Sequence, residues 1–307
     1  MFRLAVFLRR LLYWLHLLPS ARAGIPVIAI GNLSVGGSGK TPLAIHVAEL
    51  LAAKRWSPAI VSRGYGGTVR APRGVSLASD PAEVGDEPVL MARRSGCPVW
   101  VGPDRVAVIA ALRHQHPDCD VVILDDGLQH YRLRRDLEIA VVDARGFGNG
   151  MMLPAGPLRE PRSRLWTVDA VIAHGTDRVK GYAMRLEGEE LHRATDARER
   201  RAVRSFAGER VHAVAGIGDP NRFFLHLAKL GVKAVPHPFP DHHPFRAADL
   251  EFGDAAPVLM TEKDAVKCKR FAKPQHWVLP VRAVPDSAFD DWLLRRLGEL
   301  GHRPKAA

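Results

Sequence analysis

The chain has 307 residues, of which 47% are hydrophobic and 25% charged, and it carries a net charge of +11. This length accommodates one large domain or two of ordinary size, and the balance excludes disorder over long stretches. The positive charge favours anionic partners such as phosphates or an acidic membrane surface. Without zinc-finger spacing or an aromatic RNA-binding motif, we expect no nucleic-acid partner. Cys97, Cys119 and Cys268 are too scattered for a disulfide framework, which favours a reducing compartment.

Residues 1–24 contain four arginines and no acidic residue. On a helical wheel one half is wholly apolar, and the other half carries Arg3, Arg9 and Arg10. This pattern predicts an amphipathic helix over residues 1–22 that lies in the plane of an anionic membrane surface. Residues 4–18 would span only about 22 Å as a helix, too short to cross a bilayer. Two alternatives stay open: a cleaved signal peptide ending near Ala21-Arg22-Ala23, and a helix that packs on the protein's own core.

A glycine-rich segment follows a short apolar run at residues 26–30 and precedes helical spacing at residues 42–53. Strand, glycine-rich loop and helix in this order are typical of a P-loop that binds nucleotide phosphates. Lys40 would bridge the β- and γ-phosphates, and Thr41 would hold Mg²⁺. The remaining residues expected at the nucleotide are Ser34, Val35, Gly36, Gly37, Ser38 and Gly39. Ser34 departs from the motif, which usually has glycine there.

Acidic residues follow a second apolar run, at residues 121–124. Asp125 and Asp126 could reach a metal ion beside the P-loop, although two ordinary turn acids remain the alternative. Asp86 and Glu87 precede a helical stretch, where capping is the commoner role. An Asp-His-His sequence at residues 241–243 lies in a proline-rich loop, and Thr-Glu-Lys-Asp at residues 261–264 is equally well explained as a solvated turn.

Strand-like runs recur along the chain with helical patterns between them. They lie at residues 26–30, 59–62, 99–101, 121–124, 139–142 and 171–173, and then at 211–216, 234–236, 258–260 and 277–279. This alternation predicts an α/β fold, a P-loop NTPase-like doubly wound parallel sheet with a second, smaller α/β domain. We expect a core domain at residues 23–180, a linker at 181–206 containing a strand at 182–186, and a smaller lid domain at 207–307 closed by a helix at 290–300.

Taken in order, several motifs resemble those of the tetraacyldisaccharide 4′-kinase family. They are the N-terminal helix, S-x-G-G-S-G-K-T-P at 34–42, S-R-G-Y-G at 62–66, G-D-E-P at 85–88, D-D-G-L-Q-H at 125–130, L-P-A-G-P-L-R-E at 153–160 and T-E-K-D at 261–264. The resemblance extends from residue 1 to about residue 285. It implies transfer of the ATP γ-phosphate to the 4′-hydroxyl of a tetraacylated glucosamine disaccharide 1-phosphate, which forms lipid IV-A in the Gram-negative lipid A pathway.

The same resemblance implies roles for individual residues. Asp86 would be the general base, paired with His242, and His243 is the rival partner. Glu87, Asp125 and Asp126 would join Thr41 at Mg²⁺. Gln129 would lie near the nucleotide, and Tyr65 and Arg105 would face the nucleotide or the acceptor phosphate.

The resemblance further implies ATP and Mg²⁺ as cofactors and a lipid-linked disaccharide as substrate. Because acyl chains leave a membrane at high cost, we expect peripheral or monotopic attachment to the cytoplasmic face of the bacterial inner membrane, with anionic lipids as partners. We expect a monomer. Two other functions stay open: a P-loop kinase acting on a soluble metabolite, and a membrane-associated switch NTPase without an acceptor.

Overall fold

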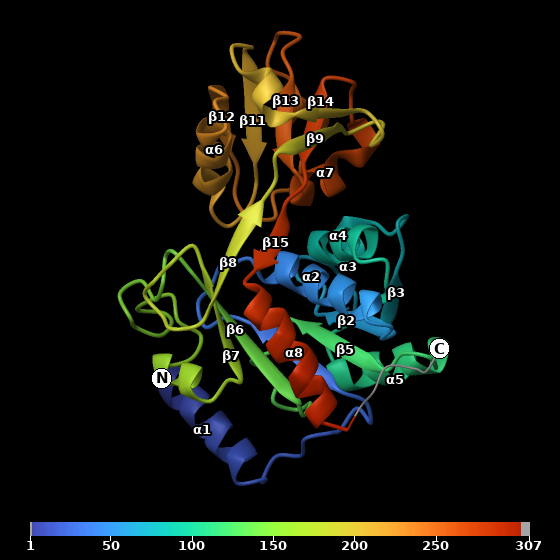
Figure 1. Cartoon of the computed structure of the whole chain (residues 1–307), viewed down its shortest axis with the longest axis vertical. Helices are drawn as coiled ribbons and strands as arrows, with labels where there is room; N and C mark the ends of the chain where they lie inside the picture. Colours follow the sequence, from blue (N-terminus) through green and yellow to red (C-terminus); the bar gives the residue numbers. More distant parts are fainter. Residues whose placement is uncertain (1, 302–307) are drawn as a thin grey trace.

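A computed structural model describes residues 2–301 and divides the chain between two β-sheets, one above the other in Figure 1. The larger sheet has the strand order β15-β8-β7-β6-β1-β5-β2-β4-β3. Its strands are β1 (Val27–Gly31), β2 (Pro58–Ser62), β3 (Arg73–Val75), β4 (Val99–Val101), β5 (Val121–Asp125), β6 (Leu137–Asp143), β7 (Ala170–His174), β8 (Tyr182–Glu187) and β15 (Arg282–Pro285). All neighbours from β4 to β8 pair in parallel, whereas β3 and β15 pair antiparallel at the two edges. The expected doubly wound parallel sheet is thereby confirmed.

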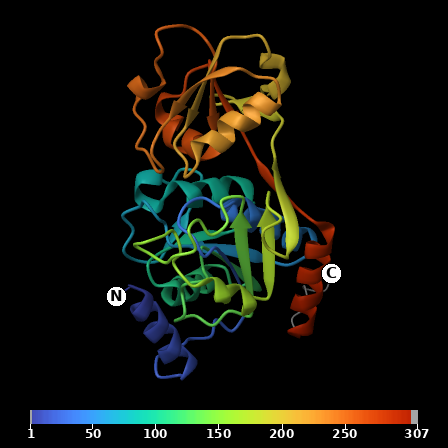
Figure 2. The same cartoon turned by 90° about the vertical axis from the view of Figure 1, so that its left-hand side faces the viewer.

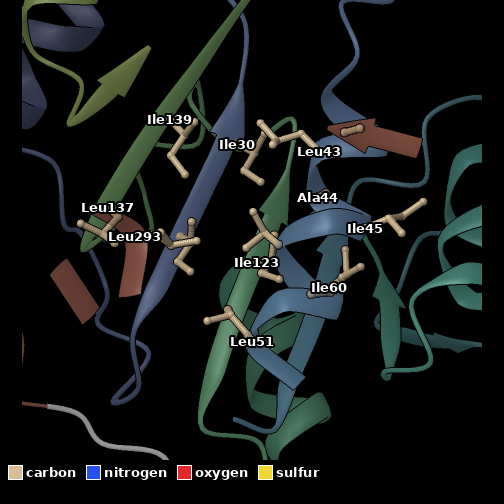
Figure 3. Close-up of a cluster of buried hydrophobic side chains, with 14 of the residues drawn as sticks. Ile30, Leu43, Ala44, Ile45, Leu51, Ile60, Ile123, Leu137, Ile139 and Leu293 are labelled. Atoms are coloured by element: carbon tan, nitrogen blue, oxygen red, sulfur yellow. The ribbon is translucent and has the colours of Figure 1, made fainter. Parts of the chain in front are cut away.

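Helices cover both faces of this sheet. They are α2 (Lys40–Ala53), α3 (Pro81–Val84), α4 (Asp86–Arg94), α5 (Arg105–Gln115), η1 (Arg162–Trp166) and α8 (Ser287–Glu299). Leu43 and Leu51 of α2 pack with Ile28 and Ile30 on one face, as Figure 3 shows for part of this cluster. On the other face α5 packs against Val27 and Ala29. Because β1 is buried on both faces, its sequence is a continuous apolar run rather than an alternating one.

The smaller sheet has the order β10-β9-β14-β13-β11-β12. Its strands are β9 (Glu190–Arg193), β10 (Arg200–Ala202), β11 (Val211–Ala215), β12 (Ala234–Pro238), β13 (Val258–Thr261) and β14 (His276–Leu279). The associated helices are η2 (Val203–Phe206), α6 (Pro220–Lys229), η3 (Ala247–Leu250), α7 (Glu262–Cys268) and η4 (Lys269–Phe271). The structure therefore confirms the expected second, smaller α/β domain.

The division of the chain differs from the one expected in two places. The segment proposed as a linker contains β8, which belongs to the larger sheet, and β9 and β10, which belong to the smaller one. The end of the chain also returns to the larger domain, because β15 pairs with β8 and Leu293 and Leu297 of α8 enter the larger core. The smaller domain is therefore an insertion joined through two strands, and it does not include α8 (Figure 2).

The N-terminal helix α1 (Phe2–Trp14) lies at the end of the larger domain that faces away from the smaller one (Figures 1 and 2). None of its side chains is buried. It contacts the body through Arg9, whose Nη2 donates to the carbonyl of Gln129 at 3.3 Å, and through Tyr13, which stacks on Tyr131. Within residues 2–301 we find no helix with the length and apolar character that a membrane crossing requires.

Candidate functional site

The P-loop joins the carboxyl end of β1 to the first residue of α2, which is Lys40. Gly36 and Gly39 have φ angles of 94° and 95°, a left-handed conformation that favours glycine. A Cβ on Gly39 would also come within 2.9 Å of Nδ1 of His174. The backbone can therefore curl so that its N–H groups and the N-terminus of α2 face a phosphate.

The start of the loop is fixed by the L-P-A-G-P-L-R-E segment. Ser34 forms an isolated antiparallel bridge with Leu158, and the N–H of Val35 donates to the carbonyl of Pro157 at 2.9 Å. Gly218 of the smaller domain approaches from the other side, so close that a Cβ on it would lie 2.8 Å from the nitrogen of Gly37. The smaller domain therefore lies directly against the phosphate loop.

Lys40 and Asp126 form an ion pair at the phosphate loop. Their side chains are 3.6 Å apart, and Arg159 pairs with the same carboxylate at 2.7 Å. Burial raises the pKa of Asp126, but the charges of Lys40 and Arg159 outweigh it and the pKa is lowered. Asp126 is consequently held ionised, as a ligand or charge partner of a metal–nucleotide complex would need to be.

Asp125 is a candidate ligand for a cation. It lies at the end of β5 and is 1% exposed. Its Oδ1 is buried without a hydrogen-bond partner, and burial together with the charges of Glu87 and Asp126 raises its pKa. A divalent cation would relieve both conditions. Among the residues described, three acidic, His or Cys side chains do not gather into a preformed metal site.

Asp86 begins α4 of the larger domain and meets His242 of the smaller domain. The Nδ1 atom of His242 lies 3.0 Å from Oδ2 and 3.2 Å from Oδ1 of Asp86, which is only 4% exposed. Burial raises the pKa of Asp86, yet the hydrogen bond from His242 and the charges of Lys263 and Lys267 outweigh it and the pKa is lowered. Conversely, the hydrogen bond to Asp86 raises the pKa of His242. The two groups form a coupled acid–base pair.

The rival histidine points elsewhere. Nε2 of His243 lies 3.0 Å from the carboxylate of Asp249, within its own domain. Tyr65 is exposed, and its ring centroid lies 5.0 Å from that of His242. The structure thus brings Tyr65, Asp86 and His242 together and leaves His243 outside this group.

Gln129 and Arg105 lie at the rear of the site. Nε2 of Gln129 donates to the carbonyl of Asn32, directly after β1, at 3.0 Å. Arg105 is buried at the start of α5, and its guanidinium donates to the carbonyls of Gly102 and Pro103. Burial, followed by the charge of Arg63, lowers the pKa of Arg105 to about 10. Arg105 lies close enough to Asp125 and Asp126 for their charges to act on its pKa. Gln129 contacts the carboxylate of Glu160 in addition to the backbone of Asn32.

Sequence reasoning did not assign roles to three cations at the site. Arg159 pairs with Asp126, Lys263 lies between Glu87 and Asp241, and Lys267 lies 3.8 Å from Asp86. The i, i+4 spacing of Lys263 and Lys267 on one helix could have suggested a shared target. Their partners Glu87 and Asp86 in the larger domain are more than 150 residues away in the sequence, so these targets were not visible.

The chain is similar to known proteins over nearly its whole length. The family described as tetraacyldisaccharide-1-P 4′-kinase (LpxK) matches residues 1–298. The chain is 50% identical over 304 residues to a tetraacyldisaccharide 4′-kinase of Azoarcus sp. (strain BH72), covering 97% of this chain and 89% of that one. It is 52% identical over 303 residues to the enzyme of that name from Alkalilimnicola ehrlichii, covering 96% and 90%. The crystal structure of "apo" form LpxK from Aquifex aeolicus in complex with ATP superposes with a TM-score of 0.80 at 29% identity, covering 96% of each chain. The chain belongs to the tetraacyldisaccharide 4′-kinase family.

Proposed function

We propose that this protein transfers the γ-phosphate of ATP to the 4′-hydroxyl of a tetraacyldisaccharide 1-phosphate, which yields lipid IV-A in lipid A biosynthesis. The observation that carries the proposal is the pair of the buried Asp86 and the partly buried His242, which two domains assemble beside a P-loop. A nucleoside triphosphatase without an acceptor has no need of such a pair.

The pair supplies the proton transfer. A sugar hydroxyl has a pKa far above 7, so the phosphoryl group must arrive as a base removes the proton. A carboxylate with a lowered pKa is a weak base alone. Because Asp86 is hydrogen-bonded to His242, the proton that Asp86 receives can be shared with this histidine, whose own pKa is raised. We assign Asp86 as the group that receives the proton and His242 as the group that orients it and shares the proton.

Lys40 and the metal-facing acids supply the electrostatics. Lys40 would stabilise the transferring phosphoryl group, while Asp125, Asp126, Glu87 and Thr41 are the residues that would hold Mg²⁺. The buried, unpartnered oxygen of Asp125 supports this assignment. When bound, the ion would neutralise charge on the β- and γ-phosphate oxygens. Gln129, Tyr65 and Arg105 would contact nucleotide or acceptor from the surrounding loops.

Membrane attachment through α1 would bring this site to its lipid substrate, at the cytoplasmic face of the inner membrane. The helix exposes a band of large apolar side chains, among them Leu4, Phe7 and Trp14. A cavity of about 450 Å³ opens beneath it, lined by α1 side chains and by Met152, Pro161 and Ser163. Apolar walls with Arg3 and Arg10 at the same cavity suit a lipid, whose acyl chains and anionic head group need both kinds of contact.

The test is transfer of ³²P from [γ-³²P]ATP to a tetraacyl disaccharide 1-phosphate in mixed micelles. Wild-type protein should label the lipid, and Lys40→Ala should not. Asp86→Ala and His242→Ala should each lower kcat by about 10²–10⁴-fold with less effect on KM for ATP. The double variant should be hardly worse than the worse single one, because paired groups act as a unit. Release of inorganic phosphate without labelled lipid would favour a switch NTPase, and labelling of a soluble sugar alone would favour a metabolite kinase.

A further inference from the structure

Lys263 is a residue of the site to which the proposed function gives no role. It lies on α7 of the smaller domain, and its side chain is mostly buried. Its Nζ is 3.1 Å from Oε1 of Glu87 in the larger domain and 3.0 Å from Oδ1 of Asp241 in the smaller one. One ammonium group therefore bridges two carboxylates on opposite sides of the domain boundary.

Asp241 directly precedes His242, and it restrains the histidine in two ways. Its Oδ1 accepts a hydrogen bond from the N–H of His242 at 3.1 Å, and its Oδ2 lies 3.7 Å from Nε2 of the imidazole. His242 has a φ of 60°, a left-handed conformation that needs local support in a residue other than glycine. The bridge through Lys263 consequently fixes the loop that presents His242 to Asp86.

The helix α7, which carries Lys263, is fixed by hydrogen bonds and by packing against the larger domain. Thr261 caps α7, and Asp264 accepts bonds from the hydroxyl of Thr261 at 2.6 Å and from the N–H of Gly216, after β11, at 2.9 Å. Val266 of the same helix packs with Val84, Val89 and Val101 of the larger domain. Packing and hydrogen bonds thus hold α7 in place, and the helix carries Lys263 to the domain boundary.

We propose that Lys263 is a positioning residue of the phosphotransfer, which holds Glu87 and Asp241 together so that His242 stays against Asp86. The inference rests on the proposed function, because it concerns the same acid–base pair. The ammonium of Lys263 contacts Glu87 and Asp241 and is not assigned a contact with the reacting atoms. It acts through His242, and its loss misplaces that side chain.

The experiment compares Lys263→Met, Lys263→Arg and a control, Lys273→Met. Lys273 lies in the same domain and also forms an ion pair, with Glu251 at 2.8 Å, but on the surface. Lys263→Met should lower kcat by about 10- to 100-fold, the scale of a small misplacement, with KM for ATP nearly unchanged. Lys263→Arg should recover most of the rate, and Lys273→Met should match the wild type.

A double-mutant cycle with His242→Ala separates positioning from an independent role. If Lys263 acts through His242, adding Lys263→Met to His242→Ala costs little more. Hydrogen exchange on nucleotide-free protein gives a readout that needs no activity: residues 239–243 should exchange faster in Lys263→Met and at the wild-type rate in Lys273→Met. If Lys263→Met does not fold, Asp241→Asn weakens the same bridge from its other end and carries the same expectations.

Additive losses in the cycle, or unchanged exchange in residues 239–243, would overturn the proposal. So would a normal kcat with a raised Mg²⁺ requirement, which would make Lys263 a partner of Glu87 alone. A wild-type protein that labels no lipid would instead refute the proposed function, and the exchange result would still decide whether Lys263 fixes the loop.

Discussion

The apolar band of α1 can be tested by replacing Leu4, Phe7 and Trp14 with glutamate. These side chains are 60%, 59% and 74% exposed, so they contribute little to packing on the protein's own body. Complete burial of such a side chain is worth about 1.5–3 kcal/mol, and somewhat over half of each is available to lipid. The three together would account for roughly 3–5 kcal/mol of membrane affinity, or about 10²–10⁴-fold, before repulsion between glutamate and anionic lipid is added.

The assay is flotation with vesicles containing anionic phospholipid, at fixed protein and increasing lipid. Wild-type protein should float and the triple variant should stay at the bottom, while its melting temperature changes little. Leu77, Leu225 and Val235 are exposed apolar residues away from α1, and replacing them with glutamate gives a matched control that should still float. If the α1 variant floats as well as the control does, α1 is not the main attachment and the apolar band has another partner.

The remaining predictions concern the site. Lys40→Ala should abolish transfer with a normal melting curve, and near-normal turnover would contradict the phosphate loop. Activity should require Mg²⁺, and Asp125→Ala or Asp126→Ala should be severely impaired; transfer in EDTA would contradict this. His242→Ala should lower the melting temperature more at pH 5.5 than at pH 9. Asp86 has a lowered pKa, so its stabilisation exists above about pH 4 and fades as pH falls through the folded pKa. His242 has a raised pKa, so its stabilisation exists below about pH 6.5 and is lost as pH rises through the folded pKa. An equal loss at both pH values would contradict the ion pair.

Local patterns predicted the central sheet well. Apolar runs such as residues 121–124 correspond to β5 (Val121–Asp125), because a strand buried on both faces needs a continuous apolar sequence. The P-loop was equally accessible, since its glycines, Lys40 and Thr41 are contiguous. The short edge strands β3 and β15 were not predicted. Arg73–Val75 is largely exposed, and Arg282–Pro285, although it buries Ala283 and Pro285, is too short to show a clear alternation.

The end of the chain shows why domain division is harder to predict. Phe289, Leu293 and Leu297 form an apolar stripe that would suit either domain, and sequence proximity favoured the smaller one. What decides the matter is the antiparallel pairing of β15 with β8, roughly a hundred residues earlier. Any residue can form the backbone hydrogen bonds between two distant strands, so the sequence does not reveal which strands pair. A helix, in contrast, shows in the sequence through the regular spacing of its apolar residues.

The Asp86–His242 pair was suggested by the family resemblance alone. The backbone conformation of His242 explains in part why the residues themselves did not point to this pair. His242 and Asp126 both adopt positive φ angles, of 60° and 53°. Aspartate and histidine tolerate this conformation better than most residues, at a cost of about 1–2 kcal/mol, so no glycine marks the position. Such strain persists only where surrounding contacts over-determine it. Here those contacts are Lys40 and Arg159 for Asp126, and Asp86 and Asp241 for His242. Asp86 lies in the larger domain and His242 in the smaller one, so the proton-accepting pair is complete only while the two domains touch.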